Sequence, residues 1–173
     1  MSESLTLVEA SKFCFETTHL RCRLLSEDDE ALYRGLYSSD SIMRYIMKPL
    51  TKTSANKSFR SAMRCFEQFP LQRLFFVVEH KADEVALGIL GISSLDWQQY
   101  SCEYGLMLTR SGQGKNYAFE ITQACLYHLT AVLGMKRIWV DISEQNSAAL
   151  KVAHRVGFKP CRTNLRLHEY LSG

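Results

Sequence analysis

The sequence contains no long hydrophobic run. No segment approaches the roughly 20 consecutive apolar residues that a membrane-spanning helix requires. The first residues include Glu3 and Glu9 and lack the continuous apolar core of a secretory signal peptide. These absences predict a cytoplasmic protein that does not associate with a membrane.

Charge of one sign is also scarce, because the formal net charge is only +3 at pH 7. Nucleic-acid-binding domains usually carry a basic stripe, whereas the basic residues here are scattered along the chain. A loose basic group near the C-terminus contains Lys151, Arg155, Lys159 and Arg162. We therefore expect no nucleic-acid partner.

The six cysteines include no C-x-x-C pair, which is a spacing that zinc sites and redox motifs use. A chain of 173 residues is also large for a scaffold held together by disulfides. We therefore expect reduced thiols, most of them buried as small hydrophobic side chains, and no bound metal.

The remaining composition is typical of a globular domain, with 46% hydrophobic and 23% charged residues. This length is enough for a single hydrophobic core, so we expect residues 1–173 to form one domain. Residues 1–12 show no periodicity and are expected to be a loose N-terminal lead-in.

Local patterns predict an alternation of strands and helices. Alternating or β-rich segments predict strands at residues 19–25, 73–80, 85–95, 102–108, 137–142 and 165–171. Helices are predicted to begin after Ser26 and to cover residues 42–47, 54–69, 113–133 and 146–156. This order indicates a mixed sheet with helices packed on it.

The helix at 113–133 carries an apolar stripe and is followed by Gly134 as a C-cap. The stripe consists of Tyr117, Ile121, Ala124, Cys125, His128 and Val132. We expect His128 to be a core histidine with a satisfied hydrogen bond rather than a catalytic group.

The stretch SGQGKNYAFE, residues 111–120, joins the strand at 102–108 to this helix. It is not a Walker loop, because Thr109 and Asn116 stand where that motif needs Gly and Ser or Thr. It is not a dinucleotide fingerprint either, because Tyr117 replaces the third glycine. The unpaired N–H groups at the start of the helix could still hold a pyrophosphate, or they could simply bind water.

Three segments in order resemble the GNAT superfamily of acetyl-CoA-dependent N-acetyltransferases. The first segment resembles motif A of the superfamily, whose loop reads Q/R-x-x-G-x-G/A; its residues are EYGLMLTRSGQGKNYAFE (103–120). The second is similar to the helix that follows the fifth strand of the family; its residues are NSAALKVAHRVGF (146–158). The third segment resembles the entry segment of the branch named for ribosomal-protein N-terminal acetyltransferases; its residues are SIMRYIMKPLTKTSANKSF (41–59). The similarity extends from about residue 18 to about residue 160.

The resemblance implies an α+β fold with a central, twisted, mostly antiparallel sheet of about six to seven strands. Helices would cover both faces, and the sheet would be splayed between its fourth and fifth strands, at 102–108 and 137–142. It also implies acetyl-CoA as co-substrate. The implied binding residues are Met107, Leu108, Thr109, Gln113, Gly114, Lys115, Asn116, Tyr117, Ala118 and Asn146. For Asn146 the alternative role is N-capping of the helix that follows it.

The sequence departs from the GNAT pattern at three positions. Asn116 replaces a family glycine, but asparagine tolerates a positive φ better than most residues, so we expect the loop to function. Ala149 replaces a serine, and Ala153 replaces the tyrosine that protonates the departing sulfur in other branches. Tyr104, Tyr117 or a water molecule could take that role.

Glu103 is the first candidate for the catalytic base. Along the strand at 102–108 it shares a face with Gly105 and Met107, and a carboxylate on an otherwise apolar central strand is costly unless it is used or paired. Branch relatives carry Glu at this place. The alternative is a salt bridge or a solvent-exposed strand end, and Asp141 is the second candidate.

We therefore predict an acetyltransferase that acts on a primary amine, which could be a protein N-terminus, as a monomer or homodimer. The acceptor pocket would be formed by Met43–Leu50 and the final strands, whose low charge disfavours polyamines or aminoglycosides. The alternative is a non-catalytic acyl-CoA-binding module, which the alanines at 149 and 153 keep open.

Acetyl-CoA should therefore raise the melting temperature, whereas NAD and ATP should not. A ligand at 100 times its Kd is expected to add about 2.7 kcal/mol to the free energy of unfolding. A thermal-shift comparison of the three nucleotides measures this. Equal shifts with all three, or no shift with acetyl-CoA, would contradict the GNAT interpretation.

Overall fold

The computed structural model describes residues 11–68, 70–162, 164 and 166–172; residues 1–10 of the expected lead-in lie outside this range. The strands are β1 (Phe15–Glu16), β2 (Leu20–Leu24), β3 (Leu74–His80), β4 (Ala86–Asp96), β5 (Ser101–Leu108), β6 (Arg137–Asp141), β7 (Lys159–Pro160) and β8 (Leu167–Leu171). The α-helices are α2 (Glu30–Tyr37), α3 (Asp40–Met43), α4 (Lys52–Met63), α5 (Tyr117–Tyr127) and α6 (Ser147–Val156). Shorter helical segments are η1 (Ser11–Phe13), η2 (Glu27–Asp29), η3 (Cys65–Glu67), η4 (Arg110–Gly112) and the π-helix η5 (His128–Val132).

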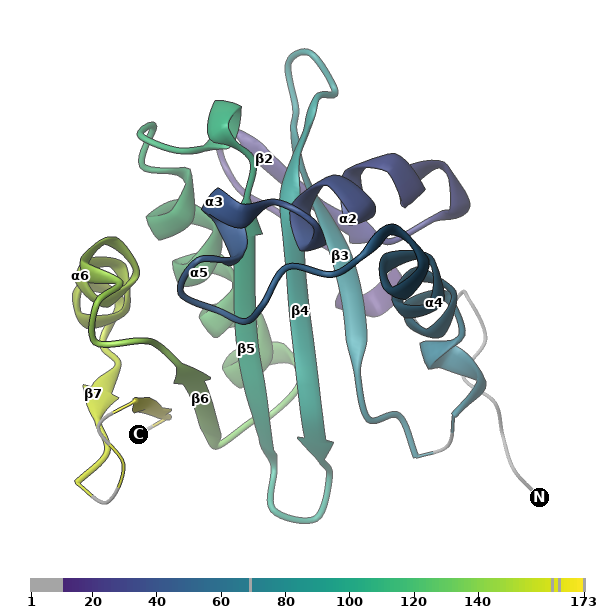
Figure 1. Ribbon diagram of the computed structural model, residues 1–173. Helices are drawn as coiled ribbons and strands as arrows, with labels where there is room; N and C mark the ends of the chain where they lie inside the picture. The colour runs from purple at the N-terminus through teal and green to yellow at the C-terminus, as the bar shows by residue number, and fades with distance from the viewer. Residues whose placement is uncertain (1–10, 69, 163, 165, 173) are drawn as a thin grey trace.

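The strands form one eight-stranded sheet in the order β1-β2-β3-β4-β5-β6-β8-β7 (Figure 1). Each neighbouring pair is antiparallel except β5 and β6, which are parallel. The predicted mostly antiparallel α+β fold is therefore confirmed. The two-residue strands β1 and β7 were missed because two residues are too few to show a period.

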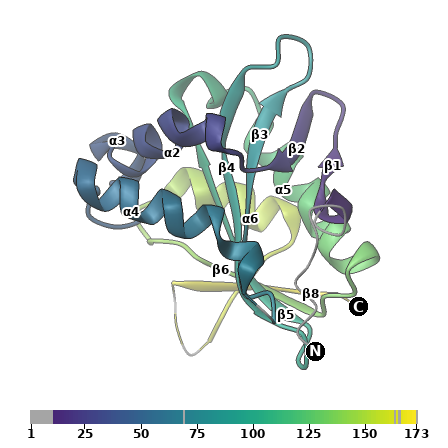
Figure 2. The same ribbon diagram turned by 90° about the vertical axis from the view of Figure 1, so that its right-hand side faces the viewer.

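Helices cover both faces of the sheet, with α2, α3 and α4 on one face and α5 on the other (Figures 1 and 2). The central strands are accordingly apolar on both sides. Along β3, Leu74, Phe76 and Val78 belong to the core beneath α5, whereas Val77 packs with α2 and α4. This arrangement explains why β3 reads as a nearly continuous hydrophobic run.

Most of the cysteines are buried, as expected from the sequence. Four of the six cysteines are buried, namely Cys22, Cys65, Cys102 and Cys125. No helix in the described ranges is long and apolar enough to cross a membrane.

The helix predicted at 113–133 is shorter and less regular than expected. It begins at Tyr117, because Gly114 and Asn116 have positive φ values that no α-helix accommodates. From His128 it widens into η5, where the Leu133 N–H donates to the His128 carbonyl over five residues (3.2 Å). This widening turns Val132 outward, so that its predicted burial is wrong and it is 57% exposed.

His128 has the structural role that the sequence suggested. Its Nε2 donates to the backbone carbonyl of Lys12 (3.0 Å), and its ring stacks on Phe15 (5.3 Å between centroids). Burial lowers the pKa of His128, so the neutral ring is the form that the fold favours.

An ion cluster fixes the start of α2. Asp29 is 5% exposed and accepts hydrogen bonds from Arg23 Nη1 (2.8 Å) and Nη2 (3.0 Å). Its carboxylate also accepts from the backbone N–H and the hydroxyl of Ser26 (both 2.8 Å). Burial alone would raise the pKa of Asp29, but the bonds from Arg23 and Ser26 outweigh it, and the pKa is lowered.

Asp29→Asn should therefore destabilise the fold by roughly 2 to 3 kcal/mol at pH 7, because Arg23 loses a buried charged partner. A carboxyl group with a lowered pKa stabilises the folded state above its ordinary pKa of about 4 and loses that contribution as the pH falls through the lowered value. The difference between wild type and variant should thus shrink below about pH 4. Urea unfolding at pH 7 and pH 3 measures both effects, and the exposed neighbour Asp28→Asn is the matched control.

Candidate active site

The sheet opens between β5 and β6. Parallel pairing joins these strands at only three positions, the last of which is Glu103 with Trp139. Beyond that pair the two strands diverge (Figure 1), while β5 continues to pair with β4 as far as Leu108. One backbone edge of β5, over residues 104–108, is therefore left without a strand partner. The predicted splay between 102–108 and 137–142 is present.

The loop after β5 ends in a row of unpaired N–H donors. Within the described residues, nothing accepts a hydrogen bond from the backbone N–H groups of residues 114–119. The first bond of the helix is donated by Glu120 N–H to the Asn116 carbonyl (3.1 Å). Six consecutive free donors at the positive end of a helix dipole are chemically suited to bind an anion.

Two of the predicted binding residues shape this loop through their own hydrogen bonds. The N–H and hydroxyl of Thr109 both donate to the Leu87 carbonyl (2.8 and 3.0 Å). The Gln113 N–H donates to the Arg110 carbonyl (3.3 Å), and its side-chain Nε2 donates to the Leu108 carbonyl (3.0 Å). The free donors thus begin at Gly114.

Glycine at position 114 leaves room where a ligand would approach. Its φ is +74°, and no heavy atom lies within 4 Å of the position that a Cβ would occupy. A side chain would therefore project into open space beside the N–H row, in a backbone conformation that disfavours it.

Asn116 adopts the left-handed conformation that its residue type suggested, with φ 64° and ψ 7°. Its Oδ1 accepts a hydrogen bond from Arg155 Nη1 on α6 (2.8 Å). The Arg155 guanidinium in turn lies 3.7 Å from the centroid of the Phe119 ring on α5. Arg155 therefore ties the loop to both helices, and sequence reasoning missed this role. The only signal was its membership of the loose basic group near the C-terminus.

The remaining predicted ligands lie at the two ends of the opening. Lys115, Tyr117 and Ala118 belong to the N–H row, with the Lys115 ammonium 6.0 Å from the centroid of the Tyr117 ring. Asn146 caps α6, since its Oδ1 accepts from the Ala149 N–H (3.2 Å). The capping alternative for Asn146 is therefore correct, and its side-chain amide N–H groups have no acceptor in the described part of the chain.

Glu103 stands where β5 and β6 part. It is half-buried, and one carboxylate oxygen accepts a hydrogen bond from the Ser93 hydroxyl on β4 (3.3 Å). Because paired residues share a face, Ser93, Glu103 and Trp139 all lie on the side of the sheet that faces α2 and α4. Asp141 shares this face but is exposed and bound to Arg166 (2.8 Å).

Residues 19–159 match the protein family described as the acetyltransferase (GNAT) domain. The chain belongs to this family. As a GNAT member it is an acyltransferase. Its resemblance to the ribosomal-protein branch remains a prediction.

Relatives agree with the GNAT assignment. An uncharacterised N-acetyltransferase, p20, from Bacillus licheniformis is 22% identical over 144 residues, which cover 83% of this chain and 80% of p20. The spermidine N-acetyltransferase of Vibrio cholerae, solved with CoA and spermine, is similar in fold at 18% identity, with a TM-score of 0.77 over 89% of this chain and 96% of that one. An acetyltransferase from Agrobacterium tumefaciens gives 19% identity and a TM-score of 0.76 over 99% and 98% of the two chains.

The two tyrosines that were considered as proton donors contact other parts of the fold. The Tyr104 hydroxyl is buried against Thr122 (2.8 Å), and burial raises the pKa of Tyr104 well above its ordinary value. The Tyr117 ring lies near His19 and His80 (6.2 and 5.7 Å between centroids), at the ends of β2 and β3.

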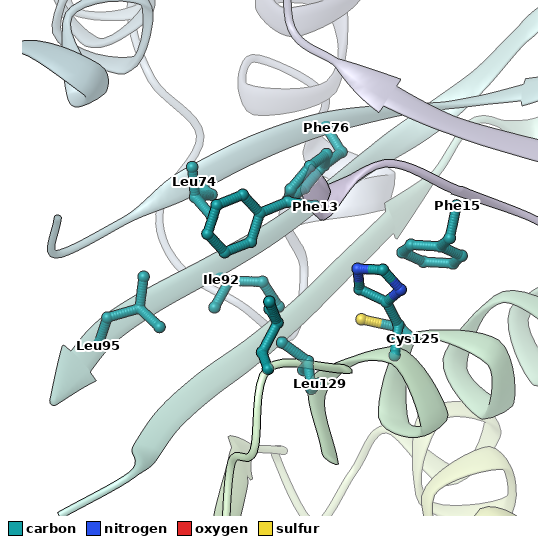
Figure 3. Close-up of a pocket in the computed structure, with 10 residues that line it drawn as sticks. Phe13, Phe15, Leu74, Phe76, Ile92, Leu95, Cys125 and Leu129 are labelled. Atoms are coloured by element: carbon teal, nitrogen blue, oxygen red, sulfur yellow. The ribbon is translucent and has the colours of Figure 1, made fainter. Parts of the chain in front are cut away.

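An apolar cavity on the α5 face is too small to be the site. Side chains from the N-terminal segment, the sheet and the α5–η5 helix surround it, including Phe13, Phe76 and Leu129 (Figure 3). Its volume is about 10 Å³, and its only strongly polar lining side chain is His128. An apolar space of that size stays dry. Among the described residues, no three His, Cys, Asp or Glu side chains are grouped to hold a metal ion.

Substitutions at Asn116 and Gly114 should have different effects on acetyl-CoA affinity. Asn116→Gly should leave acetyl-CoA affinity equal or higher, because glycine adopts the positive φ freely and Arg155 can still stack on Phe119. Gly114→Val should weaken binding about tenfold or more, because a β-branched side chain disfavours this φ and intrudes beside the free donors. Isothermal titration calorimetry measures both affinities.

Gly134→Val is the matched control. Gly134 also has a positive φ (+70°) and no heavy atom within 4 Å of the place that its Cβ would take, but it lies after the far end of the helix. It should lower the melting temperature without changing the affinity of the folded protein. Normal acetyl-CoA binding by Gly114→Val would show that the pyrophosphate is held elsewhere.

Proposed function

We propose that the protein is an acetyl-CoA-dependent N-acetyltransferase that transfers the acetyl group to a primary amine. The observation behind this proposal is that the unpaired edge of β5 leads directly to the row of free N–H groups at the start of α5. The free edge of β5 runs from Glu103, at the vertex, to the row of free N–H groups that begins at Gly114. A long ligand with a pyrophosphate at one end and a reactive group at the other fits such a track.

Each part of the track suits one part of acetyl-CoA. The N–H groups of residues 114–119 would hold the pyrophosphate. The backbone of β5 near Met107 and Leu108 would pair with the pantetheine amides, as a missing strand would. The free side-chain amide of Asn146 would reach the same arm from α6. Acetyl-CoA, when bound, supplies an acetyl group activated as a thioester.

Glu103 would prepare the acceptor. An α-amine has an ordinary pKa of about 8 and a lysine amine about 10.4, so near neutral pH the proton must be removed before nitrogen can attack. Glu103, directly or through one water molecule, would take that proton, and Ser93 would orient its carboxylate. The C–N bond then forms, the C–S bond breaks, and the extra proton on the acylated nitrogen passes through water to the thiolate, which leaves an amide and a free thiol. A thiol with a pKa of about 8.5 leaves readily without a dedicated acid.

The acceptor would enter from the face that carries Glu103. The segment between α3 and α4 crosses in front of β4 and β5 on that face (Figure 1). Its Ile46 and Met47 side chains are 48% and 52% exposed, so they offer apolar contacts to an acceptor. The Vibrio cholerae neighbour was solved with CoA and an amine, which supports an amine acceptor. A protein N-terminus is our first choice.

Replacing Glu103 with Gln should lower kcat while acetyl-CoA affinity stays nearly unchanged. The substitution keeps size and hydrogen bonding but removes the base, which typically costs about 10² to 10⁴ in rate. Raising the pH should partly restore the rate, because more of the amine is then already neutral. Steady-state kinetics across pH, with the melting temperature of each variant, measures this.

Asp141→Asn is the control, since this carboxylate shares the face but is exposed and paired with Arg166. It should leave kcat nearly unchanged. A lowered melting temperature of Glu103→Gln with an intact kcat would make Glu103 structural and move the base to Asp141 or water. Failure of every amine to react would favour an acyl-CoA-binding module.

A further inference from the structure

A second groove lies on the outer surface of α4, away from the proposed acetyl-CoA track. It has a volume of about 490 Å³ and is lined by Thr53, Asn56, Lys57, Arg60 and Arg64. These positions recur at helical spacing on the face opposite the buried residues of α4, Ala55, Phe59 and Ala62. The groove is therefore a feature of one helix face that solvent reaches.

The segment around this groove holds the positive charge of the whole chain. Residues 41–66 contain six basic residues and no acidic one: Arg44, Lys48, Lys52, Lys57, Arg60 and Arg64. They are six of the 21 Lys and Arg residues, so the remainder of the chain has 15 basic residues against all 18 acidic ones. The small net charge of +3 is therefore the sum of a positive excess in residues 41–66 and a net negative charge over the other residues.

These six cations are available to a partner. All six are exposed, and none forms an ion pair with another of the described residues. Two exposed cations elsewhere do pair, since Arg137 binds Glu169 and Arg166 binds Asp141. Lys52, Lys57 and Arg60 lie within α4, and Arg64 is its C-cap. Unpaired like charges this close along a helix repel each other, and the repulsion is relieved when an anion binds.

Asn56 adds a second, independent observation. Asn56 lines the groove, and its Oδ1 is buried and accepts no hydrogen bond from the described residues. An unmet buried acceptor is unfavourable, so it favours a ligand that brings an N–H group. Lys57 and Arg60 line the same groove.

We propose that the α4 groove binds an acidic peptide segment of a protein acceptor, and this proposal rests on the function proposed above. The α4 groove, lined as given above, lies on the same side of the sheet as Glu103. A peptide offers both things that the groove lacks, carboxylates for its cations and backbone N–H groups for Asn56. Nucleic-acid phosphates would satisfy the cations, but a phosphate backbone carries no N–H donor for Asn56.

The test measures peptide binding without acetyl-CoA, so that docking is separated from catalysis. The probe is a fluorescein-labelled peptide with a free N-terminus and alternating Glu residues, compared by anisotropy with the same peptide carrying Gln. The acidic peptide should bind about tenfold more tightly, and added salt should weaken it. The triple variant Lys57→Gln, Arg60→Gln, Arg64→Gln should lose that tenfold preference.

A matched triple variant controls for net charge. Lys151→Gln, Lys159→Gln, Arg162→Gln removes the same charge from the exposed basic group near the C-terminus, and it should bind the acidic peptide as wild type does. Equal binding of both peptides, or wild-type binding by the α4 variant, would overturn the proposal. Stronger competition by a single-stranded oligonucleotide of equal charge would also overturn it and assign the groove to nucleic acid.

Acetylation of the two peptides distinguishes failure of docking from failure of the proposed function. If kcat/KM favours the acidic peptide about tenfold and the α4 variant abolishes this preference, the docking proposal and the proposed acetyltransferase function both stand. If both peptides are acetylated equally well by every variant, docking fails while the acetyltransferase function stands. If the acidic peptide binds but no amine is ever acetylated, docking stands and the proposed function fails.

Discussion

The active-site region depends on one interrupted strand pairing. Backbone N–H and C=O groups inside a sheet need partners, and β5 loses its partner on one side after Glu103. The reason lies in β6, which pairs with β8 at all five of its residues and therefore follows β8 away from β5. The gap that results is a strand-shaped space with unmet hydrogen-bonding groups along one wall, which is what an extended ligand with amide groups requires.

The anion-binding loop depends on contacts from both helices beside it. Positive φ at Gly114 and Asn116 delays the start of α5 and leaves six N–H groups in a row. Arg155 then fixes Asn116 by a hydrogen bond and stacks on Phe119. The position of α6 against α5 thus decides the shape of the loop, so a residue 39 positions away from Asn116 compensates for the absence of the family glycine.

The alternation of β5 separates two kinds of environment. Tyr104 points into the core beneath α5 and is bound to Thr122, whereas its neighbour Glu103 lies on the opposite face beside Ser93. The α5 face is filled by the larger hydrophobic core, which leaves only the small dry cavity of Figure 3. The opposite face carries Glu103, the exposed apolar residues before α4 and the basic groove. The proposed chemistry and the proposed peptide docking therefore both use the face that α2 and α4 cover.

Local patterns in the sequence determined the order of the main strands and helices, the family, and the loop that begins α5. They did so because alternation, capping residues and turn residues act over a few neighbours. The π-helix at His128–Val132 and the two-residue edge strands could not be predicted, since packing against the sheet and pairing with distant strands produce them. The site divides in the same way. Glu103, Gly114 and Asn116 are recognisable from adjacent residues, but the contact of Arg155 with Asn116 and the pairing of Glu103 with Trp139 exist only after helices and strands distant in sequence have packed together.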